Sequence, residues 1–176
     1  MRLLRHLLSI ALLPATVTLI IPARIITTTR KIHPGWGLSL PWEILPLLLG
    51  GCLIVIGLSL LVNTIRMFAT IGRGTLAPWD PTQRLVVKGV YRYVRNPMIS
   101  GVLFILLGES ALFGSWPLFN WFLLFFLINA IYIPLTEERG LQRRFGEDYR
   151  LYRTNVPRWI PRLRPWETDD RGAGQG

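Results

Sequence analysis

The feature that most constrains the fold is an unbroken run of uncharged residues from Ile44 to Ile65. A helix of these 22 residues would be roughly 33 Å long, which is enough to cross the hydrocarbon core of a bilayer. The run therefore predicts a transmembrane helix. It also contains the small residues Gly50, Gly51, Gly57 and Ser59. These side chains either let a neighbouring helix approach closely or are the ordinary small residues of a membrane helix.

Two other apolar stretches predict further membrane helices. Leu7–Ala23 is uncharged and is interpreted as a first membrane helix, with a secretory signal peptide as the alternative. The residues from 96 to 136 contain one charge, Glu109, and are interrupted by GSWP at 114–117. Glycine and proline there indicate a turn, so we expect a helical hairpin at about 98–113 and 117–135. Glu109 is either a functional acid at membrane depth or a side chain that pairs or reaches the surface.

The composition supports a membrane protein. Of the 176 residues, 51% are hydrophobic and only 17% are charged, whereas a soluble domain carries about 25% charged residues. Such an apolar chain is not a disordered one. One cysteine and two histidines argue against a disulfide scaffold and against a zinc or iron–sulfur centre, so no metal site is predicted.

Basic residues give the chain a formal net charge of +10. They gather in two regions, 66–95 and 139–171, on either side of the predicted hairpin. Arginine and lysine between apolar runs are typical of the cytoplasmic loops of membrane proteins. We therefore expect these regions to meet a membrane surface, and we expect no nucleic-acid partner.

The segment 136–153 carries an apolar stripe at helical spacing, formed by Leu141, Phe145, Tyr149 and Tyr152, with arginines on its other faces. This pattern predicts an amphipathic helix that covers the end of the bundle. The segment 156–166 has three prolines and cannot form a regular helix. The predicted fold class is thus an all-α integral membrane protein, with about four transmembrane helices and a C-terminal amphipathic helix over a cofactor pocket on the cytoplasmic side. Its parts are N-terminal membrane helices in 1–70, a core in 71–166 and a disordered tail in 167–176.

Two polar segments are candidates for chemistry. The first is 73–101, where Pro97 favours a helix start that leaves free amides near Asn96. The second is Glu137–Glu138, directly after an apolar span. Together they would recognise an anionic and a cationic group in one pocket, as a zwitterionic, cationic cofactor requires. The alternatives are a polar interfacial loop and a pair of solvated acids.

Three segments resemble a known family: LVVKGVYRYVRNPMISG (85–101), TEERGLQRRFGEDYRLYR (136–153) and VPRWIP (156–161). They are similar to the integral-membrane isoprenylcysteine carboxyl methyltransferases and phospholipid N-methyltransferases. The pattern of that family is G-x-Y-x-x-x-R-[HN]-P-x-Y-x-G, a helical hairpin, E-E-x-x-L-x-x-x-F-G-x-x-Y-x-x-Y and V-P-R-x-x-P. Order and spacing match over 73–161, about half of the chain.

The resemblance implies a membrane methyltransferase that uses S-adenosylmethionine. In it Glu137 would stabilise the cationic end of the cofactor, and Glu138 is a candidate base. The positions it assigns to cofactor binding are Gln83, Arg84, Leu85, Val86, Tyr91, Asn96, Pro97, Met98, Ile99 and Glu137. Three positions depart from the family or from part of it. Asn96 replaces the commoner histidine, Ile99 replaces the usual tyrosine, and Ile133 stands where the eukaryotic prenylcysteine enzymes have an arginine.

The expected activity is methylation of a lipophilic acceptor, either an isoprenoid-cysteine-like carboxylate or a phospholipid or other small lipid. The expected location is a bacterial inner membrane, among membrane lipids, with the active site facing the cytoplasm. Two alternatives from other classes are an NADPH-dependent oxidoreductase like the membrane sterol reductases, and a non-enzymatic membrane protein that keeps the same fold.

Overall fold

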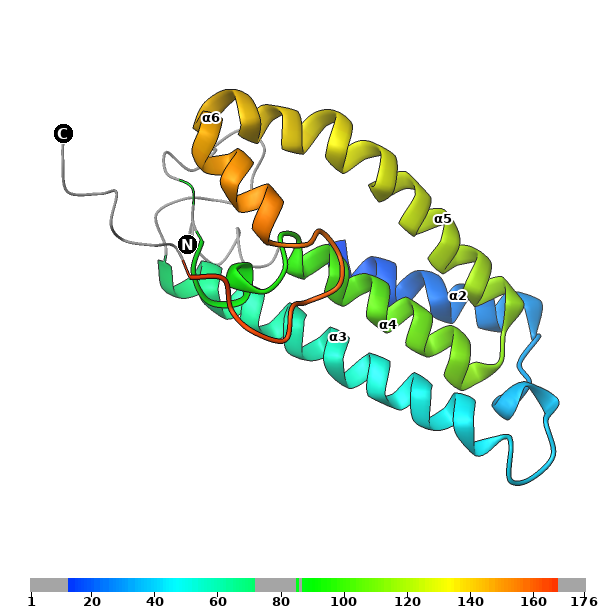
Figure 1. Cartoon of the computed structure of the whole chain (residues 1–176). Coiled ribbons are helices and arrows are strands. Elements are labelled where there is room, and N and C mark those ends of the chain that lie inside the picture. The colour runs from blue at the N-terminus through cyan, green and yellow to red at the C-terminus, as the bar shows by residue number, and fades with distance from the viewer. Residues whose placement is uncertain (1–12, 72–84, 86, 168–176) are drawn as a thin grey trace, which may run out of the picture.

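The computed structural model describes residues 13–71, 85 and 87–167, and the regular structure in them is helical. Helices α2, α3, α4 and α5 run lengthwise beside one another, and α6 turns back over one end of the bundle (Figure 1). We call this end the α6 end and the opposite one the far end. The elements are η1 Thr16–Ile20, α2 Ile21–Thr29, η2 Pro34–Gly37, α3 Ile44–Ile71, η3 Gly89–Arg92, α4 Pro97–Phe113, α5 Trp116–Tyr132, η4 Ile133–Glu137 and α6 Glu138–Asn155.

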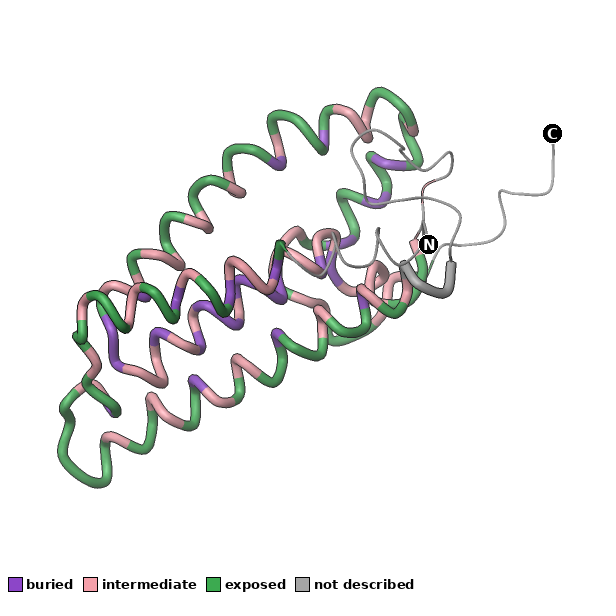
Figure 2. Tube along the Cα trace, turned by 180° about the vertical axis from the view of Figure 1, so that it is seen from behind, coloured by how far each residue is buried: buried purple, intermediate pink, exposed green. Residues whose placement is uncertain are grey.

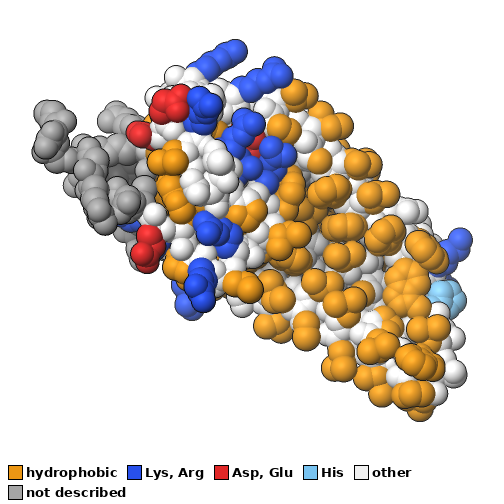
Figure 3. Space-filling view, in the orientation of Figure 1, with side chains coloured by type: hydrophobic (Ala, Val, Ile, Leu, Met, Phe, Trp, Pro, Cys, Tyr) orange, Lys and Arg blue, Asp and Glu red, His pale blue; other side chains and the backbone are white. Residues whose placement is uncertain are grey.

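Helix α4 is the centre of the bundle. Its buried side chains are spread over its whole length, from Pro97 to Ser110 (Figure 2). The helices around it expose large apolar side chains, such as Leu48 and Val55 on α3 and Ile131 on α5. Exposed apolar surface of this extent indicates contact with lipid. Figure 3 shows hydrophobic side chains over the helices and most of the basic side chains near α6.

Two helical stretches of the described residues are long and apolar enough to cross a membrane, Ile44–Met67 and Trp116–Asn155. Helix α4, with 17 residues, is apolar but shorter. These helices confirm the all-helical class, the long apolar helix predicted from Ile44 and the hairpin of α4 and α5. The count of four spans stays a prediction.

Helices α3 and α4 pack through a line of four glycines, which we call the glycine seam: Gly50, Gly57, Gly101 and Gly108. A Cβ added to Gly57 would lie 2.6 Å from the carbonyl oxygen of Gly101, and one on Gly50 would lie 2.8 Å from that of Gly108. Gly50 and Gly57 are seven residues apart on α3, and Gly101 and Gly108 are seven residues apart on α4. Seven residues are about two helical turns, so both glycines of a helix lie on the same face. Gly50 and Gly57 therefore allow the close packing of α3 on α4. Gly51 has no such role, because a Cβ added there would meet nothing within 4 Å.

The far end of the bundle is closed by the loop before α3. The His33 amide donates to the carbonyl of Phe113, and the Trp36 indole donates to that of Ala111. Trp36 also meets Trp116 edge-on, with ring centroids 5.0 Å apart. The turn between α4 and α5 needs Gly114, because its φ is +55° and a Cβ would collide with the His33 carbonyl. This turn confirms the one predicted from GSWP.

The first helix ends later than predicted. Its residues before 13 lie outside the described residues, but the helix continues past Ala23 to Thr29. The helix ends at Arg30, which adopts the left-handed conformation and donates its amide to the Ile26 carbonyl. Before that end, the Thr27 and Thr29 hydroxyls donate to the carbonyls of Ala23 and Ile25 within the helix. The polar sequence therefore remains helical, and the predicted end at Ala23 was wrong.

The C-terminal amphipathic helix is broken at Gly146. Its φ and ψ are 50° and −122°, which a side-chain-bearing residue rarely adopts. The Gln142 side chain donates to the Gly146 carbonyl across the break. The prediction of a single helix over 136–153 was therefore wrong at this residue, although the inward stripe was right: Tyr149, Tyr152 and Val156 form a buried cluster, against which Leu141 and Phe145 pack.

Candidate functional site

The paired glutamates are positioned by a wide helical turn at the end of α5. Pro134 has no amide proton and cannot continue a regular helix, and residues Ile133–Glu137 adopt a π-helical turn instead. The Glu138 amide then donates to the Ile133 carbonyl. Such turns are rare, but they are frequent at functional sites. Here the turn leaves Glu137 exposed and directs Glu138 into the protein, where it is buried.

Glu138 joins two segments that are far apart in the sequence. One carboxylate oxygen, Oε1, lies 2.8 Å from Arg95 Nη1 and 2.7 Å from Arg158 Nε. The other, Oε2, lies 2.9 Å from Arg158 Nη2. The Glu138 side chain is only 4% exposed and that of Arg95 9%. Charge-assisted bonds of this kind are strong and geometrically specific. They hold the residue before Asn96 beside the residue after Glu137.

The chain after α6 forms an irregular strap over residues 156–167 that lies along the segment before α4. The Arg95 amide donates to the Pro157 carbonyl, and the Arg162 amide donates to that of Tyr93. Arg92 Nε donates to the Trp166 carbonyl at 2.8 Å. These bonds satisfy backbone groups that the prolines leave out of a helix. The strap thereby carries Arg158 to Glu138.

Tyr91 belongs to η3, in the segment before α4, and contacts α6. Its carbonyl accepts a hydrogen bond of 2.8 Å from the hydroxyl of the buried Tyr152. Burial, and secondly the negative charge of Glu137, raise the pKa of the Tyr91 hydroxyl well above its ordinary value. The Glu137 carboxylate is thus within electrostatic range of Tyr91, a residue 46 positions earlier in the chain.

The start of α4 presents polar groups next to the glutamates. Asn96 is the N-cap of α4, but its side chain makes no capping hydrogen bond. On either side of it, Arg95 Nε and Ser100 Oγ are buried and have no hydrogen-bond partner among the described residues. Native proteins pair almost all buried polar atoms. Arg95 Nε and Ser100 Oγ are therefore two exceptions near the start of α4.

The structure brings most of the predicted site residues to the α6 end. Tyr91, Asn96 and Glu137 lie there, and Pro97, Met98 and Ile99 form the first turn of α4. Leu85 makes an apolar contact instead of offering a polar group: it packs against the buried cluster of Tyr149, Tyr152 and Val156. Gln83, Arg84 and Val86 lie outside the described residues. That these side chains bind a cofactor stays a prediction.

Glu109 is not part of this site. It lies 12 residues after Pro97 on α4, about 18 Å along the helix axis. Its Oε2 atom is buried and has no partner among the described residues. The two interpretations of this acid therefore both remain open.

Arg95, Arg158 and Ser100 were missed as contributors to the site. Both arginines stand inside the segments that carry the family resemblance, RNP and VPR, and this is the signal that could have identified them. Their shared partner could not be read from spacing, because Glu138 is 43 residues from one and 20 from the other. Nothing in the sequence distinguishes Ser100 from other small residues of a membrane helix.

Comparison with known proteins identifies the family. The profile of the phospholipid methyltransferase family matches residues 45–148, which is more than half of the chain. The chain therefore belongs to this family, as the resemblance in its motifs predicted. The match runs from α3 into α6 and includes both the glycine seam and the paired glutamates.

Two curated relatives share the same region. The protein-S-isoprenylcysteine O-methyltransferase of Schizosaccharomyces pombe is 39% identical over 80 residues, 44% of this chain and 33% of the relative. Methanethiol S-methyltransferase 2 of Bradyrhizobium diazoefficiens is 37% identical over 86 residues, 47% of this chain and 31% of the relative. The aligned regions thus cover about a third of each relative. No solved structure matches the chain.

Proposed function

We propose that this protein is an S-adenosylmethionine-dependent methyltransferase that acts on a lipophilic acceptor at the membrane surface. Membership of the phospholipid methyltransferase family supports methyl transfer. The observation that carries the proposal is the ion pair between Arg95 and Glu138, because it places the start of α4 beside the glutamates. Two polar segments far apart in the sequence can then act on one ligand.

The side chains at the α6 end fit the cofactor. S-adenosylmethionine has a positively charged sulfonium, a carboxylate and an ammonium group, and when bound it supplies the methyl group. Glu137 is exposed and offers a carboxylate to a cationic group. The amide of Asn96 and the unpaired Ser100 hydroxyl offer hydrogen bonds to polar groups. Tyr91 offers an aromatic face, which also attracts cations.

The residues would act by holding the reactants and excluding water. Methyl transfer is an in-line displacement in which the sulfonium loses its charge, so alignment and a dry site supply much of the catalysis. Glu138 would position the segments that form the site, since both of its carboxylate oxygens accept hydrogen bonds from arginines. To act as the base predicted from sequence, Glu138 would have to exchange one of these bonds for a substrate proton.

A lipophilic acceptor would reach the site from the bilayer. The site lies where the apolar helices end, so a lipid headgroup can meet it while its tail stays in hydrocarbon. We place the α6 end at the cytoplasmic face of a bacterial inner membrane, because the basic residues gather at that end (Figure 3). In this proposal the first helix, α3, α4 and α5 are four spans.

Titration calorimetry of the full chain in detergent micelles tests the proposal. We expect S-adenosylmethionine to bind and Glu137→Ala to remove measurable binding. Glu147→Ala is the matched control, because it removes the same charge from an exposed side chain of α6 and should bind like the unmodified protein. Normal binding by Glu137→Ala would contradict the assignment.

Two further arms test the alternatives. Binding of NADPH instead of S-adenosylmethionine would identify an oxidoreductase, and binding of neither would favour a non-enzymatic membrane protein. Membranes that contain the protein should also transfer a labelled methyl group from S-adenosylmethionine to an extractable lipid. Analysis of the labelled lipid would name the acceptor and its methylated atom.

A further inference from the structure

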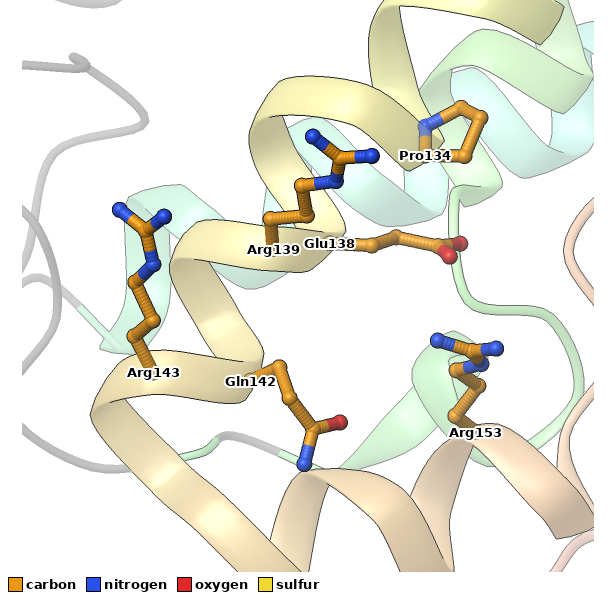
Figure 4. A pocket seen from close by; sticks show the side chains of 6 residues that line it. All are labelled: Pro134, Glu138, Arg139, Gln142, Arg143 and Arg153. Atoms are coloured by element: carbon orange, nitrogen blue, oxygen red, sulfur yellow. The ribbon is translucent and has the colours of Figure 1, made fainter.

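A polar pocket lies at the turn from α5 into α6, and none of the residues assigned to S-adenosylmethionine is among those that line it. Its volume is about 210 Å³. Figure 4 shows the six residues around it, with the side chains of Arg139 and Arg143 on one side and that of Arg153 on the other. They are Pro134, Glu138, Arg139, Gln142, Arg143 and Arg153.

The break at Gly146 brings these arginines together. In a straight helix Arg139 and Arg153 would lie 14 residues apart, or about 21 Å along the axis. The change of direction at Gly146, whose φ is 50°, lets the two halves of α6 line one cavity instead. The break in the amphipathic helix therefore has a consequence: it builds a concave basic surface.

The cavity has an excess of positive charge. Glu138 is its one acidic lining residue, and that carboxylate is already paired with Arg95 and Arg158. Within the described part of the chain, no ion pair is found for Arg139, Arg143 or Arg153. The lining thus carries three guanidinium groups against one carboxylate, which is already paired. Guanidinium binds phosphate through paired hydrogen bonds, which makes arginine the preferred residue for such groups.

The cavity also borders the lipid-facing side of α5. Pro134 lies on its rim, and Ile131 and Leu127 precede it on the same face at helical spacing. These two side chains are 61% and 48% exposed. An amphipathic ligand could therefore place an anionic group among the arginines and an apolar chain along α5. A free inorganic ion would use only the first of these two surfaces.

We propose that this cavity binds the phosphate group of an anionic membrane phospholipid, whose acyl chain lies along Leu127 and Ile131. The pocket has room for more than a bare ion, since its 210 Å³ is more than ten times the roughly 10–15 Å³ that one water molecule needs. The pocket shares Glu138 with the network that positions the methyl-donor site, but that carboxylate is already paired with Arg95 and Arg158. The pocket would bind its lipid whether or not the chain transfers methyl groups.

The test measures binding of dihexanoyl phosphatidylglycerol to the full chain in detergent. The pocket variant carries Arg143→Gln and Arg153→Gln. The control variant carries Arg150→Gln and Arg164→Gln, which remove two charges outside the cavity. All four side chains are exposed, and we expect both variants to fold. The pocket variant should bind the lipid about tenfold more weakly, or worse, because each arginine provides charged hydrogen bonds.

Three comparisons can overturn the proposal. An equal loss of affinity in both variants would show attraction to general surface charge and no site. Binding of inorganic phosphate as tightly as the lipid would show a site for the free ion. Equal affinity for dihexanoyl phosphatidylcholine would show that net anionic charge is not recognised. Weakening by Arg143→Lys, which keeps the charge but loses the guanidinium fork, would support the proposal, and its absence would oppose it.

Binding of S-adenosylmethionine is measured on the same samples. An unchanged titration in the pocket variant shows that its fold and its methyl-donor site are intact. Failure of the proposed function would appear as loss of that titration in the unmodified protein. The two proposals can therefore fail separately.

Discussion

The glycine seam and the α6 end hold the same chain together by opposite means. Along the seam, helices α3 and α4 approach through glycines, with backbone close to backbone. At the α6 end, contact is made by a buried carboxylate with two arginines and by tyrosines. The surroundings explain the difference. Lipid gives apolar side chains no reason to associate, so close fit must drive helix packing there. At the membrane surface, charged hydrogen bonds can fix a specific arrangement.

The comparison teaches where function can be placed. A seam of glycines sets the distance between two helices but offers no chemical group to a ligand. A network of charged groups fixes a geometry and also brings other polar groups beside it, here Asn96 and Glu137. The glycine seam thus fixes the position of α4 against α3. The charged network at the α6 end then sets the polar groups at the start of α4 beside Glu137.

The largest effect is expected for the buried ion pair. Glu138→Gln leaves Arg95 and Arg158 without their counter-charge, and breaking a buried pair in this way costs about 3–5 kcal/mol. Thermal unfolding in detergent measures the loss. Glu147→Gln is the control, because it breaks an ion pair at the surface: the side chain of Arg150 is 71% exposed and that of Glu147 is 83% exposed. Equal stability of the two variants would show that the buried Glu138 network stabilises the fold no more than the exposed Arg150–Glu147 pair does.

The seam should respond to size and not to charge. Gly57→Leu forces a side chain toward the Gly101 carbonyl, and overpacking of this kind costs about 1–3 kcal/mol or more. Gly51→Leu is the matched control on the same helix, because a Cβ at Gly51 meets nothing within 4 Å. The melting temperatures of the two variants in the same detergent make the comparison. A Gly57→Leu protein as stable as the control would refute close packing of α3 on α4.

A smaller effect is expected from one hydroxyl at the α6 end. Tyr152→Phe keeps the ring in its cluster but removes the bond to the Tyr91 carbonyl. A hydrogen bond of this kind contributes about 0.5–1.5 kcal/mol. Chemical denaturation should show that loss, with the helical content unchanged. Stability equal to that of the unmodified protein would mean that water replaces the hydroxyl at no cost.

The smallest effect is expected for the exposed pair of α6. Arg150→Ala removes the partner of Glu147, and exposed pairs contribute less than about 1 kcal/mol. Salt should reduce even this difference, because exposed charges are screened. A loss as large as that of Glu138→Gln would contradict the contrast between buried and exposed charges at the α6 end.

Much of the fold followed from patterns within single segments. The start of α3 at Ile44, the turn at Gly114 and the stripe that contains Tyr149 and Tyr152 each depend on residues close in the sequence. A local pattern is enough to predict such elements. The continuation of the first helix to Thr29 was missed, because its hydroxyls bond back to the helix and offset the polar composition.

The site needed contacts that no local pattern contains. The sequence motifs predicted Asn96 and Glu137 as site residues. The pairing of Glu138 with Arg95 and Arg158 could not be predicted, because it depends on the path of the strap over residues 156–167. The break at Gly146 was hidden because the apolar stripe continues through it. One signal was available and unused: Gly50 and Gly57, like Gly101 and Gly108, are seven residues apart, as expected of two faces that pack together.

Binding of S-adenosylmethionine to single and double variants tests the central claim most directly. The claim is that Asn96 and Glu137 act on one methyl donor at the α6 end. Calorimetry should show that Asn96→Ala and the milder Glu137→Gln each weaken binding measurably, by about tenfold or more, and that the loss in the double variant differs from the sum of the two. Single variants that bind like the unmodified protein, in samples with unchanged melting temperatures, would contradict it.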